Sequence, residues 1–353
     1  MCAKLKQENQ LSKKTELNLS EKLRKRNKFK WFGYHLANLL YYQNPQSSLR
    51  KGYENSFHCC DTLSQERGKI TSKYCKNRWC PQCQRIRMGA LINAYGPRLS
   101  EEKDLYFVTL TRPNVKADEL KDEINKYQEL WRKIAKERWF AKATKGNLIG
   151  IKKLECTYHA TRTKLYKRVK WVEEHGKKRK VETFIPTDVP DPWYDTYHPH
   201  FHVLVSSYEI AEEILSKWLE LNPTSRRKAQ DLRKVTGNKG YLEVFKYFTK
   251  LIAKDNLGKR YFDAPHMNTI FEAMKGKRVY FRIGRKDVWR CEELIEDDIE
   301  EEAALFTDEE EQRFFKWVNA EDFFGYYDVD SGEALTEMRP PQHLKEIFDK
   351  AEQ

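Results

Sequence analysis

The alternation of hydrophobic and polar residues in the middle of the chain predicts a sheet packed against helices. Residues 105–111, 148–158 and 200–205 alternate with the two-residue period of a strand. Residues 117–140 and 209–221 repeat their apolar positions at helical spacing instead. Strands and helices mixed in this way are typical of an α+β domain, and we expect the helix at 209–221 to lie behind the strand that precedes it.

Weaker patterns extend this picture along the chain. Residues 20–42 predict a basic amphipathic helix, residues 85–94 a helix that stops near Gly96, residues 241–252 a helix preceded by Gly240, and residues 278–283 one further strand.

An insertion separates the strand at 148–158 from the strand that begins near His200. Its two halves, residues 164–172 and 178–184, are rich in β-branched residues and flank a turn at His175. This pattern predicts a hairpin. Its many Lys and Arg side chains fit either an arm that grips DNA or a hairpin that is simply solvated.

The charge along the chain predicts a polyanionic partner. The formal net charge is +13 over 353 residues, yet residues 291–353 hold 21 acidic and 5 basic residues, so the rest is far more basic than the total suggests. Charge alone does not separate nucleic acid from an anionic membrane. Aromatic residues interleaved with Lys and Arg, as in residues 28–32 and 166–171, favour nucleic acid, because bases stack on them.

Membrane and secretory classes are not expected. The chain has no run of 18 apolar residues, and its first residues lack the apolar stretch of a secretory signal. We therefore expect a cytoplasmic protein with no membrane partner. Five of the eight cysteines lie between Cys59 and Cys83, which favours metal binding in a reducing compartment over disulfides.

The cysteine spacing predicts a structural zinc site. Cys80 and Cys83 form a Cys-Pro-x-Cys knuckle, and Cys75 precedes them. Cys59 and Cys60 compete for the fourth position, and His58 is an outside candidate. Because four protein ligands leave no open coordination position, such a site would hold the fold together and would not bind substrate.

Two histidines predict a second, catalytic metal site. His200 and His202 are two residues apart on an apolar strand, so their side chains point the same way. Mg²⁺ or Mn²⁺ needs an oxygen ligand as well, and Glu155 can supply it if its strand lies beside the histidine strand. His159 and His198 are rival third ligands.

A tyrosine later in the chain is the predicted nucleophile. A metal that polarises a phosphate and the phenol of Tyr247 would together cleave a phosphodiester. Lys246 and Lys250 would add positive potential, since Lys250 shares a helix face with Tyr247. Glu243 lies on that face too, four residues before the tyrosine.

Four of these motifs, in this order, resemble the rolling-circle replication initiators of small bacterial plasmids. These initiators are a branch of the endonucleases named HUH for a His-hydrophobic-His strand. The resemblance covers residues 55–255 and rests on the segments 74–83 (YCKNRWCPQC), 106–111 (YFVTLT), 197–205 (YHPHFHVLV) and 243–247 (EVFKY).

The resemblance implies a central antiparallel sheet of HUH type and a single-tyrosine nickase. Family members carry a Cys followed four residues later by Leu, which Cys59 and Leu63 match, so Cys59 is preferred over Cys60. A carboxylate from the neighbouring strand completes their catalytic metal site, and the resemblance implies that Glu155 has this role. A Glu at the offset of Glu243 acts in them at termination. The products would be a 5′-phosphotyrosyl enzyme and a free 3′-OH that primes a host polymerase.

The resemblance and the composition together predict four regions. These are a basic helical segment at 1–50, a zinc-binding module at 51–98, the endonuclease domain at 99–290 with its hairpin at about 160–186, and an acidic region at 291–353 that forms small helices or stays partly disordered. The acidic region would screen the basic body by mimicking DNA, or recruit a host helicase.

Two other functions fit the same residues. A single-tyrosine transposase of the same fold would share the chemistry, although such enzymes lack this cysteine module. A zinc-dependent DNA-binding regulator would use the two histidines for structure only. Metal-dependent nicking separates this regulator from the catalytic alternatives.

Overall fold

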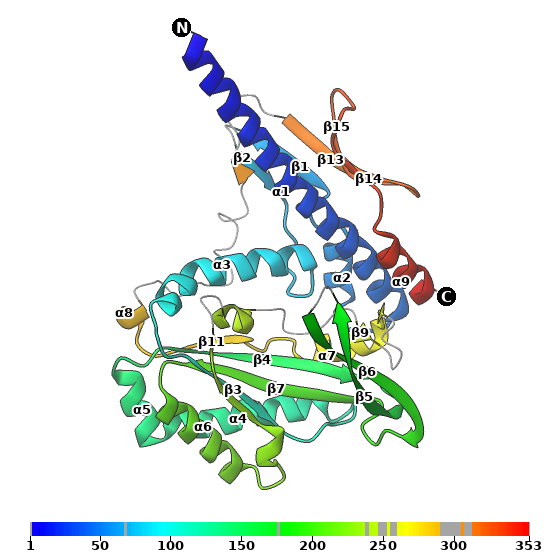
Figure 1. The fold of residues 1–353 in the computed structure, drawn as a ribbon. Helices are drawn as coiled ribbons and strands as arrows, with labels where there is room; N and C mark the ends of the chain where they lie inside the picture. The colour runs from blue at the N-terminus through cyan, green and yellow to red at the C-terminus, as the bar shows by residue number, and fades with distance from the viewer. Residues whose placement is uncertain are drawn as a thin grey trace. The chain divides into compact units, whose positions relative to one another are not determined.

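The computed structural model describes most of the chain as two compact units (Figure 1). The described residues are 2–66, 69–174, 177–236, 240–245, 253–254, 260–289, 305–306 and 313–352. Residues 1–91 and 294–353 form unit 1, and residues 92–293 form unit 2. This division differs from the four predicted regions, because the acidic C-terminal region groups with the N-terminal part of the chain.

Unit 2 contains a five-stranded antiparallel sheet. The alternation predicted a sheet, and the resemblance implied an antiparallel one. In spatial order its strands are β11 (Tyr280–Ile283), β4 (Gly150–His159), β7 (Thr196–Val205), β3 (Tyr106–Thr111) and β8 (Asp231–Lys234). The histidine strand β7 is central and pairs with β4 along its whole length. The short edge strand β8 was not predicted.

Helices cover one face of this sheet (Figure 1). Phe201 of β7 lies 5.3 Å from Tyr127 of α4 (Leu120–Lys136) and 6.1 Å from Trp218 of α6 (Tyr208–Leu221), measured between ring centroids. Ser207 caps α6 by accepting a hydrogen bond from the backbone N–H of Ile210. Because side chains alternate along a strand, the residues next to Phe201 face away from the helices.

The predicted single helix at 117–140 is two helices in the structure. A residue with extended backbone, Glu137 at φ −60° and ψ 139°, separates α4 from α5 (Arg138–Lys145). The remaining elements of unit 2 are η1 (Arg227–Ala229), η2 (Gly240–Phe245), β9 (Ala253–Lys254), β10 (Arg260–Tyr261), α7 (Ala264–Ala273) and α8 (Lys286–Trp289). The described part of the predicted helix at 241–252 is therefore a 3₁₀ helix, and residues 246–252 lie outside the described residues.

The predicted hairpin is present and longer than expected. It consists of β5 (Thr163–Glu174) and β6 (Lys177–Pro190), which extend from the ends of β4 and β7 (Figure 1). Among the residues that the structure describes, these two strands pair only with each other. We call these two strands the arm.

Unit 1 combines a six-stranded sheet with a long helix. Its strands, in spatial order, are β12 (Leu305–Phe306), β2 (Lys69–Ser72), β1 (Thr62–Glu66), β13 (Arg313–Asn319), β14 (Phe324–Asp328) and β15 (Ala334–Met338). Its helices are α1 (Cys2–Gln43), α2 (Arg50–Phe57) and α9 (Gln342–Glu352).

One more helix, α3 (Pro81–Ser100), begins in unit 1 and ends in unit 2. The predicted stop near Gly96 was wrong, because α3 runs through Pro97 to Ser100.

The described part of the acidic region forms strands and one helix, not the small helices or disorder expected. Phe315 and Trp317 of β13 and Phe324 and Tyr326 of β14 are buried, with the two-residue period of a strand. The ring of Phe324 lies 5.8 Å from that of Trp31 in α1. Burial of these aromatic residues makes the region part of the core of unit 1.

Candidate metal centres

The strand register places three predicted ligands together in unit 2. Glu155 of β4 lies directly opposite His200 of β7, and His202 lies one pair further along on the same face. This is the face opposite Phe201, so helices α4 and α6 do not cover it. One ligand atom from each of the three residues lies within 4.8 Å of the other two. We call these three residues the triad.

The distances within the triad fit a divalent cation. The Nε2 atoms of His200 and His202 are 3.1 Å apart, and Nε2 of His202 is 3.4 Å from Oε2 of Glu155. Two ligands held about 2.1 Å from an octahedral ion at right angles are about 3.0 Å apart. The two imidazoles and the carboxylate could therefore hold one ion. This set of nitrogen and oxygen donors suits both Mg²⁺ and Mn²⁺.

The other ring nitrogens of the two histidines are held by the protein. Nδ1 of His200 donates to the backbone carbonyl of His198 at 3.1 Å, and Nδ1 of His202 lies 3.2 Å from the hydroxyl oxygen of Thr109 in β3. A carbonyl only accepts, so Nε2 of His200 carries the free lone pair. Hydrogen bonds of this kind fix the tautomer and the orientation of metal-binding histidines.

A buried lysine lies beside the triad. Nζ of Lys153 is 2.7 Å from Oε2 of Glu155, and its side chain is 1% exposed. Burial alone would raise the pKa of the Glu155 carboxyl, but its contact with His202 and the charge of Lys153 hold this pKa well below its usual range. Burial, reinforced by the neighbouring His202, lowers the pKa of His200 to about 3. Near neutral pH the triad therefore offers a carboxylate and a neutral His200.

The two rival histidines lie outside the triad. His159 contacts Asp191, with Nε2 3.1 Å from Oδ2, and Nδ1 of His198 lies 2.8 Å from Oδ1 of Asn114. The structure thus places Glu155 beside His200 and His202, whereas His159 and His198 contact other side chains.

The tyrosine motif begins on the same face of the sheet. Glu243 is exposed in η2, which contacts both β4 and β7. At the end of η2 the carbonyl of Phe245 accepts a hydrogen bond of 3.4 Å from the hydroxyl of Tyr280. Tyr280 pairs with Lys153 across β11 and β4, so it shares the face of the triad. Its pKa is raised by burial and by the charge of Glu155.

The other predicted catalytic residues, Tyr247, Lys246 and Lys250, lie outside the described residues. Sequence reasoning missed Lys153, Thr109 and Tyr280. Only Lys153 left a signal, since it stands two residues before Glu155 on one strand. The other two reach the triad through strand pairings far apart in the chain.

In unit 1 the predicted zinc ligands form a second cluster. The sulfur atoms of Cys59, Cys75, Cys80 and Cys83 lie within 4.8 Å of one another. The sulfur of Cys83 is 3.7 Å from that of Cys59 and 3.6 Å from that of Cys75. Tetrahedral zinc with bonds of about 2.3 Å would separate its sulfur ligands by about 3.8 Å. The four thiols thus fit a zinc ion.

Backbone groups support this cysteine cluster. The N–H of Asn77 donates to the sulfur of Cys75 at 3.4 Å, and the N–H of Cys75 donates to the sulfur of Cys59 at 3.5 Å. Lys76, which lies between Cys75 and Asn77, has a backbone φ of 55°. This left-handed conformation turns the chain sharply around the cluster. Donors aimed at sulfur stabilise the thiolate form, which is the metal-binding one.

The two alternative ligands are not part of this group of four, although the sulfur of Cys60 lies 3.7 Å from that of Cys59. Although burial opposes it, contact with Cys59 and the guanidinium of Arg26 lower the pKa of the Cys60 thiol to about 6. Nδ1 of His58 lies 2.9 Å from Oδ2 of Asp61, and the His58 side chain is mostly exposed. The structure therefore groups Cys59, not Cys60 or His58, with the other three cysteines.

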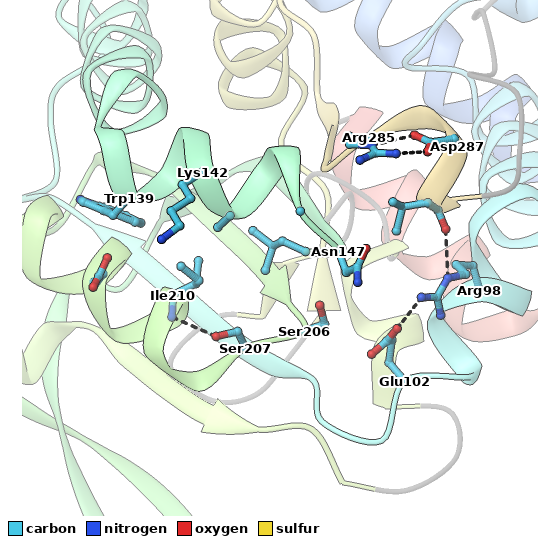
Figure 2. Close-up of a pocket in the computed structure, with 15 residues that line it drawn as sticks. Arg98, Glu102, Trp139, Lys142, Asn147, Ser206, Ser207, Ile210, Arg285 and Asp287 are labelled. Atoms are coloured by element: carbon cyan, nitrogen blue, oxygen red, sulfur yellow. Dashed lines mark hydrogen bonds and ion pairs between the residues drawn. The ribbon is translucent and has the colours of Figure 1, made fainter.

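A separate cleft of about 1040 Å³ contains none of the triad residues (Figure 2). It lies at the other end of β7, where Ser206 and Ser207 lead into α6. Its charged side chains have both signs, and Figure 2 shows Arg98 paired with Glu102 and Arg285 with Asp287. This cleft has no chemistry that matches the predicted function.

The two clusters are candidate metal sites of different kinds, one made of two imidazoles and a carboxylate on a sheet and one made of four thiols. The chain belongs to the replication protein family, whose model matches residues 68–326. This confirms the resemblance to plasmid replication initiators.

Two curated proteins and the solved structures complete the comparison. A protein of Staphylococcus aureus named "Protein rep" is 29% identical over 212 residues, which are 55% of this chain and 77% of that protein. A "Protein rep" of a Bacillus species is 26% identical over 209 residues, or 53% of this chain and 56% of that protein. No solved structure matches the chain significantly. Among the described residues, no helix is long and apolar enough to span a membrane.

Proposed function

We propose that this protein initiates rolling-circle replication of a plasmid by nicking one strand of the origin DNA. One observation carries the proposal: the triad converges on the sheet face against which η2 packs, and residue 247 follows η2 by two residues in the sequence. The family match and the basic composition of residues 1–290 support DNA as the substrate. The antiparallel sheet with the histidine strand at its centre is consistent with the HUH type.

Glu155, His200 and His202 would hold Mg²⁺ or Mn²⁺, which supplies polarisation of the scissile phosphate when bound. The protein residues then perform the reaction. The phenolic oxygen of Tyr247 attacks phosphorus in line and loses its proton to water. The P–O bond to the 3′ oxygen breaks, and that oxygen takes a proton from water. The products are a 5′-phosphotyrosyl link and a free 3′-OH.

Three residues near Tyr247 have supporting roles in the proposal. Lys246 and Lys250 supply positive potential to the phosphate during attack. Glu243, exposed in η2, activates water or a second cleavage at termination, so that one round ends without a second covalent link. The 3′-OH primes a host polymerase, and a host helicase separates the strands ahead of it.

The cysteine cluster would hold a structural Zn²⁺. Four thiolates close the coordination sphere, so this centre would order unit 1 and take no part in cleavage. The nearest rival, a transposase with the same chemistry, is disfavoured by this cluster and by the family match.

Tyrosine variants test the proposal directly. Wild-type protein incubated with Mn²⁺ and single-stranded origin oligonucleotides should form a covalent adduct, and mass analysis should place it on the peptide that contains Tyr247. The Tyr247→Phe variant should bind origin DNA and form no adduct. Tyr241→Phe is the matched control, because Tyr241 lies in η2 and should not attack the DNA. An adduct in Tyr247→Phe would refute the assignment. Origin binding without metal-dependent nicking in the wild type would favour a DNA-binding regulator.

A further inference from the structure

The arm is an exposed ribbon with large apolar side chains in water. The most exposed aromatic side chains are those of Trp171 at 68%, Tyr166 at 63% and Phe184 at 49%. Soluble proteins rarely leave several large apolar residues together in water unless they contact a partner. A two-stranded ribbon has no core of its own, so these apolar side chains cannot be buried within the arm.

The pairing register gives the arm two different faces. Residues directly opposite one another share a face, so Trp171, Val169 and Phe184 lie on one side with Lys167 and Lys180 beside them. Glu182 on this side pairs with both lysines, at 2.8 Å and 2.9 Å. We call this side the aromatic face.

The opposite side is the cationic face. Arg168, Lys170 and Arg179 project from it, together with Tyr166. All four side chains are exposed. This side therefore carries three positive charges among the described side chains.

The root of the arm is fixed next to the triad. Strand β4, which carries Glu155, runs on to His159, and Asp191 contacts both the ring of His159 and the backbone of Arg162. The first residue of β5, Thr163, is the eighth residue after Glu155, a contour of at most about 26 Å. The arm itself is about 40 Å long. A DNA strand held in the triad would therefore pass within reach of the arm.

From this arrangement we propose that the arm binds unpaired DNA, with bases stacked on Trp171 and Phe184 of the aromatic face and with phosphates drawn over the edge of the ribbon to Arg168 and Lys170 of the cationic face. The choice of DNA as the ligand rests on the proposed function. Unpaired bases expose their flat faces and stack on aromatic side chains, whereas bases within a duplex are stacked on each other. An aromatic face backed by a cationic face thus fits a melted strand better than a duplex, and the arm would guide that strand to the triad.

Binding to a labelled single strand of about 16 nucleotides tests this proposal in the full-length protein. Fluorescence anisotropy in the presence of a chelator separates binding from cleavage. Trp171→Ala and Phe184→Ala should each raise the Kd for the single strand about tenfold, and Trp171→Phe should restore most of the affinity because it restores a ring. Tyr208→Ala is the matched control, since Tyr208 is an exposed aromatic at the opposite end of β7. Its Kd should equal that of the wild type.

The cationic face is tested by salt. The double variant Arg168→Ala with Lys170→Ala should lower the slope of log Kd against log salt concentration by about 1.4, because each phosphate contact contributes about 0.7 for a single strand. The aromatic variants should leave this slope unchanged.

The outcomes separate the arm from the nuclease. Wild-type affinity for the single strand in both Trp171→Ala and Phe184→Ala overturns the role of the arm, even if the protein nicks DNA. A wild-type protein that binds through the arm but never nicks overturns the proposed function and leaves the arm intact. A change in molar mass by light scattering in the aromatic variants, with unchanged DNA binding, would show that the aromatic face joins two copies of the chain and would also overturn the proposal.

Discussion

Replacing Lys153 with methionine tests whether the buried lysine balances the charge of the triad. Nζ of Lys153 is 2.7 Å from the Glu155 carboxylate, and both side chains are largely buried. Methionine keeps the length of the side chain and removes its charge. Removing one partner of a buried ion pair costs about 3–5 kcal/mol, because the remaining charge keeps its desolvation cost without its attraction. For a unit of this size such a loss lowers Tm by about 10 °C.

A divalent cation should reverse this loss. The ion would neutralise Glu155 in place of the missing ammonium, so Mn²⁺ should raise the Tm of Lys153→Met more than that of the wild type. Loss of a positive charge a few ångströms from the ion should also tighten Mn²⁺ binding, by about tenfold or more, since such pairs interact with several kcal/mol near a protein interior. Thermal unfolding with a chelator or with Mn²⁺, together with calorimetric titration, measures both effects.

Lys152 provides the matched control on the other face of β4. Its Nζ is fully buried 4.0 Å from the ring centroid of Phe201 and 3.9 Å from that of Phe281. Burial, with a smaller contribution from Arg278, lowers its pKa well below the usual value. Lys152→Met should therefore be neutral or stabilising and should leave the response to Mn²⁺ unchanged. Equal stability and equal Mn²⁺ response in Lys153→Met and the wild type would refute the charge balance.

Three further predictions concern unit 1. Cys75→Ser should lower the zinc content measured by atomic absorption and the Tm of unit 1, as a strong chelator should, whereas Cys60→Ser should keep its zinc. Burial lowers the pKa of His35 to about 4, although the charge of Asp349 opposes this shift. The unfolded chain therefore binds the proton more tightly than the folded chain does. The free energy of unfolding should fall by up to about 3 kcal/mol as the pH drops from about 6.5 to about 4. His35→Leu should unfold in urea with less dependence on pH across that window. Gly325→Ala should destabilise unit 1 by about 1–3 kcal/mol or more, because its new Cβ would lie 1.8 Å from a backbone carbonyl of β15; unchanged urea unfolding would contradict the role of the acidic region in the core.

The sequence predicted the centre of unit 2 well because the period of a strand is simple. Alternation alone placed His200 and His202 on one face and Glu155 on one face of its own strand. That the two strands are neighbours was a conditional expectation, which the register of β4 and β7 supports. Lys153 was overlooked because a lysine at a strand position is ordinarily exposed, and its burial depends on elements far away in the chain.

The prediction for the acidic region was wrong because it rested on composition and overlooked a strand pattern. The many acidic residues after position 291 suggested helices or disorder, although Phe315 and Trp317 repeat with the period of a strand. These side chains pack against the N-terminal part of the chain, about 250 residues earlier. A pattern in a short stretch of sequence cannot reveal such a contact. Pro97 was interpreted as the end of a helix, yet it stands in the last turn of α3, where one missing N–H is tolerated within a helix that continues for three more residues.

The candidate nuclease site is a property of strand register across the whole sheet. One lateral row on the face away from the helices contains Tyr280, Lys153, His202 and Thr109, from four adjacent strands, and the next row contains Glu155 opposite His200. A slip of one residue between β7 and its neighbours would turn both histidines toward the helices and the apolar side chains toward the triad. The apolar face buried under α4 and α6 therefore does more than stabilise unit 2. It fixes the one register in which imidazoles, carboxylate and the start of the tyrosine motif meet.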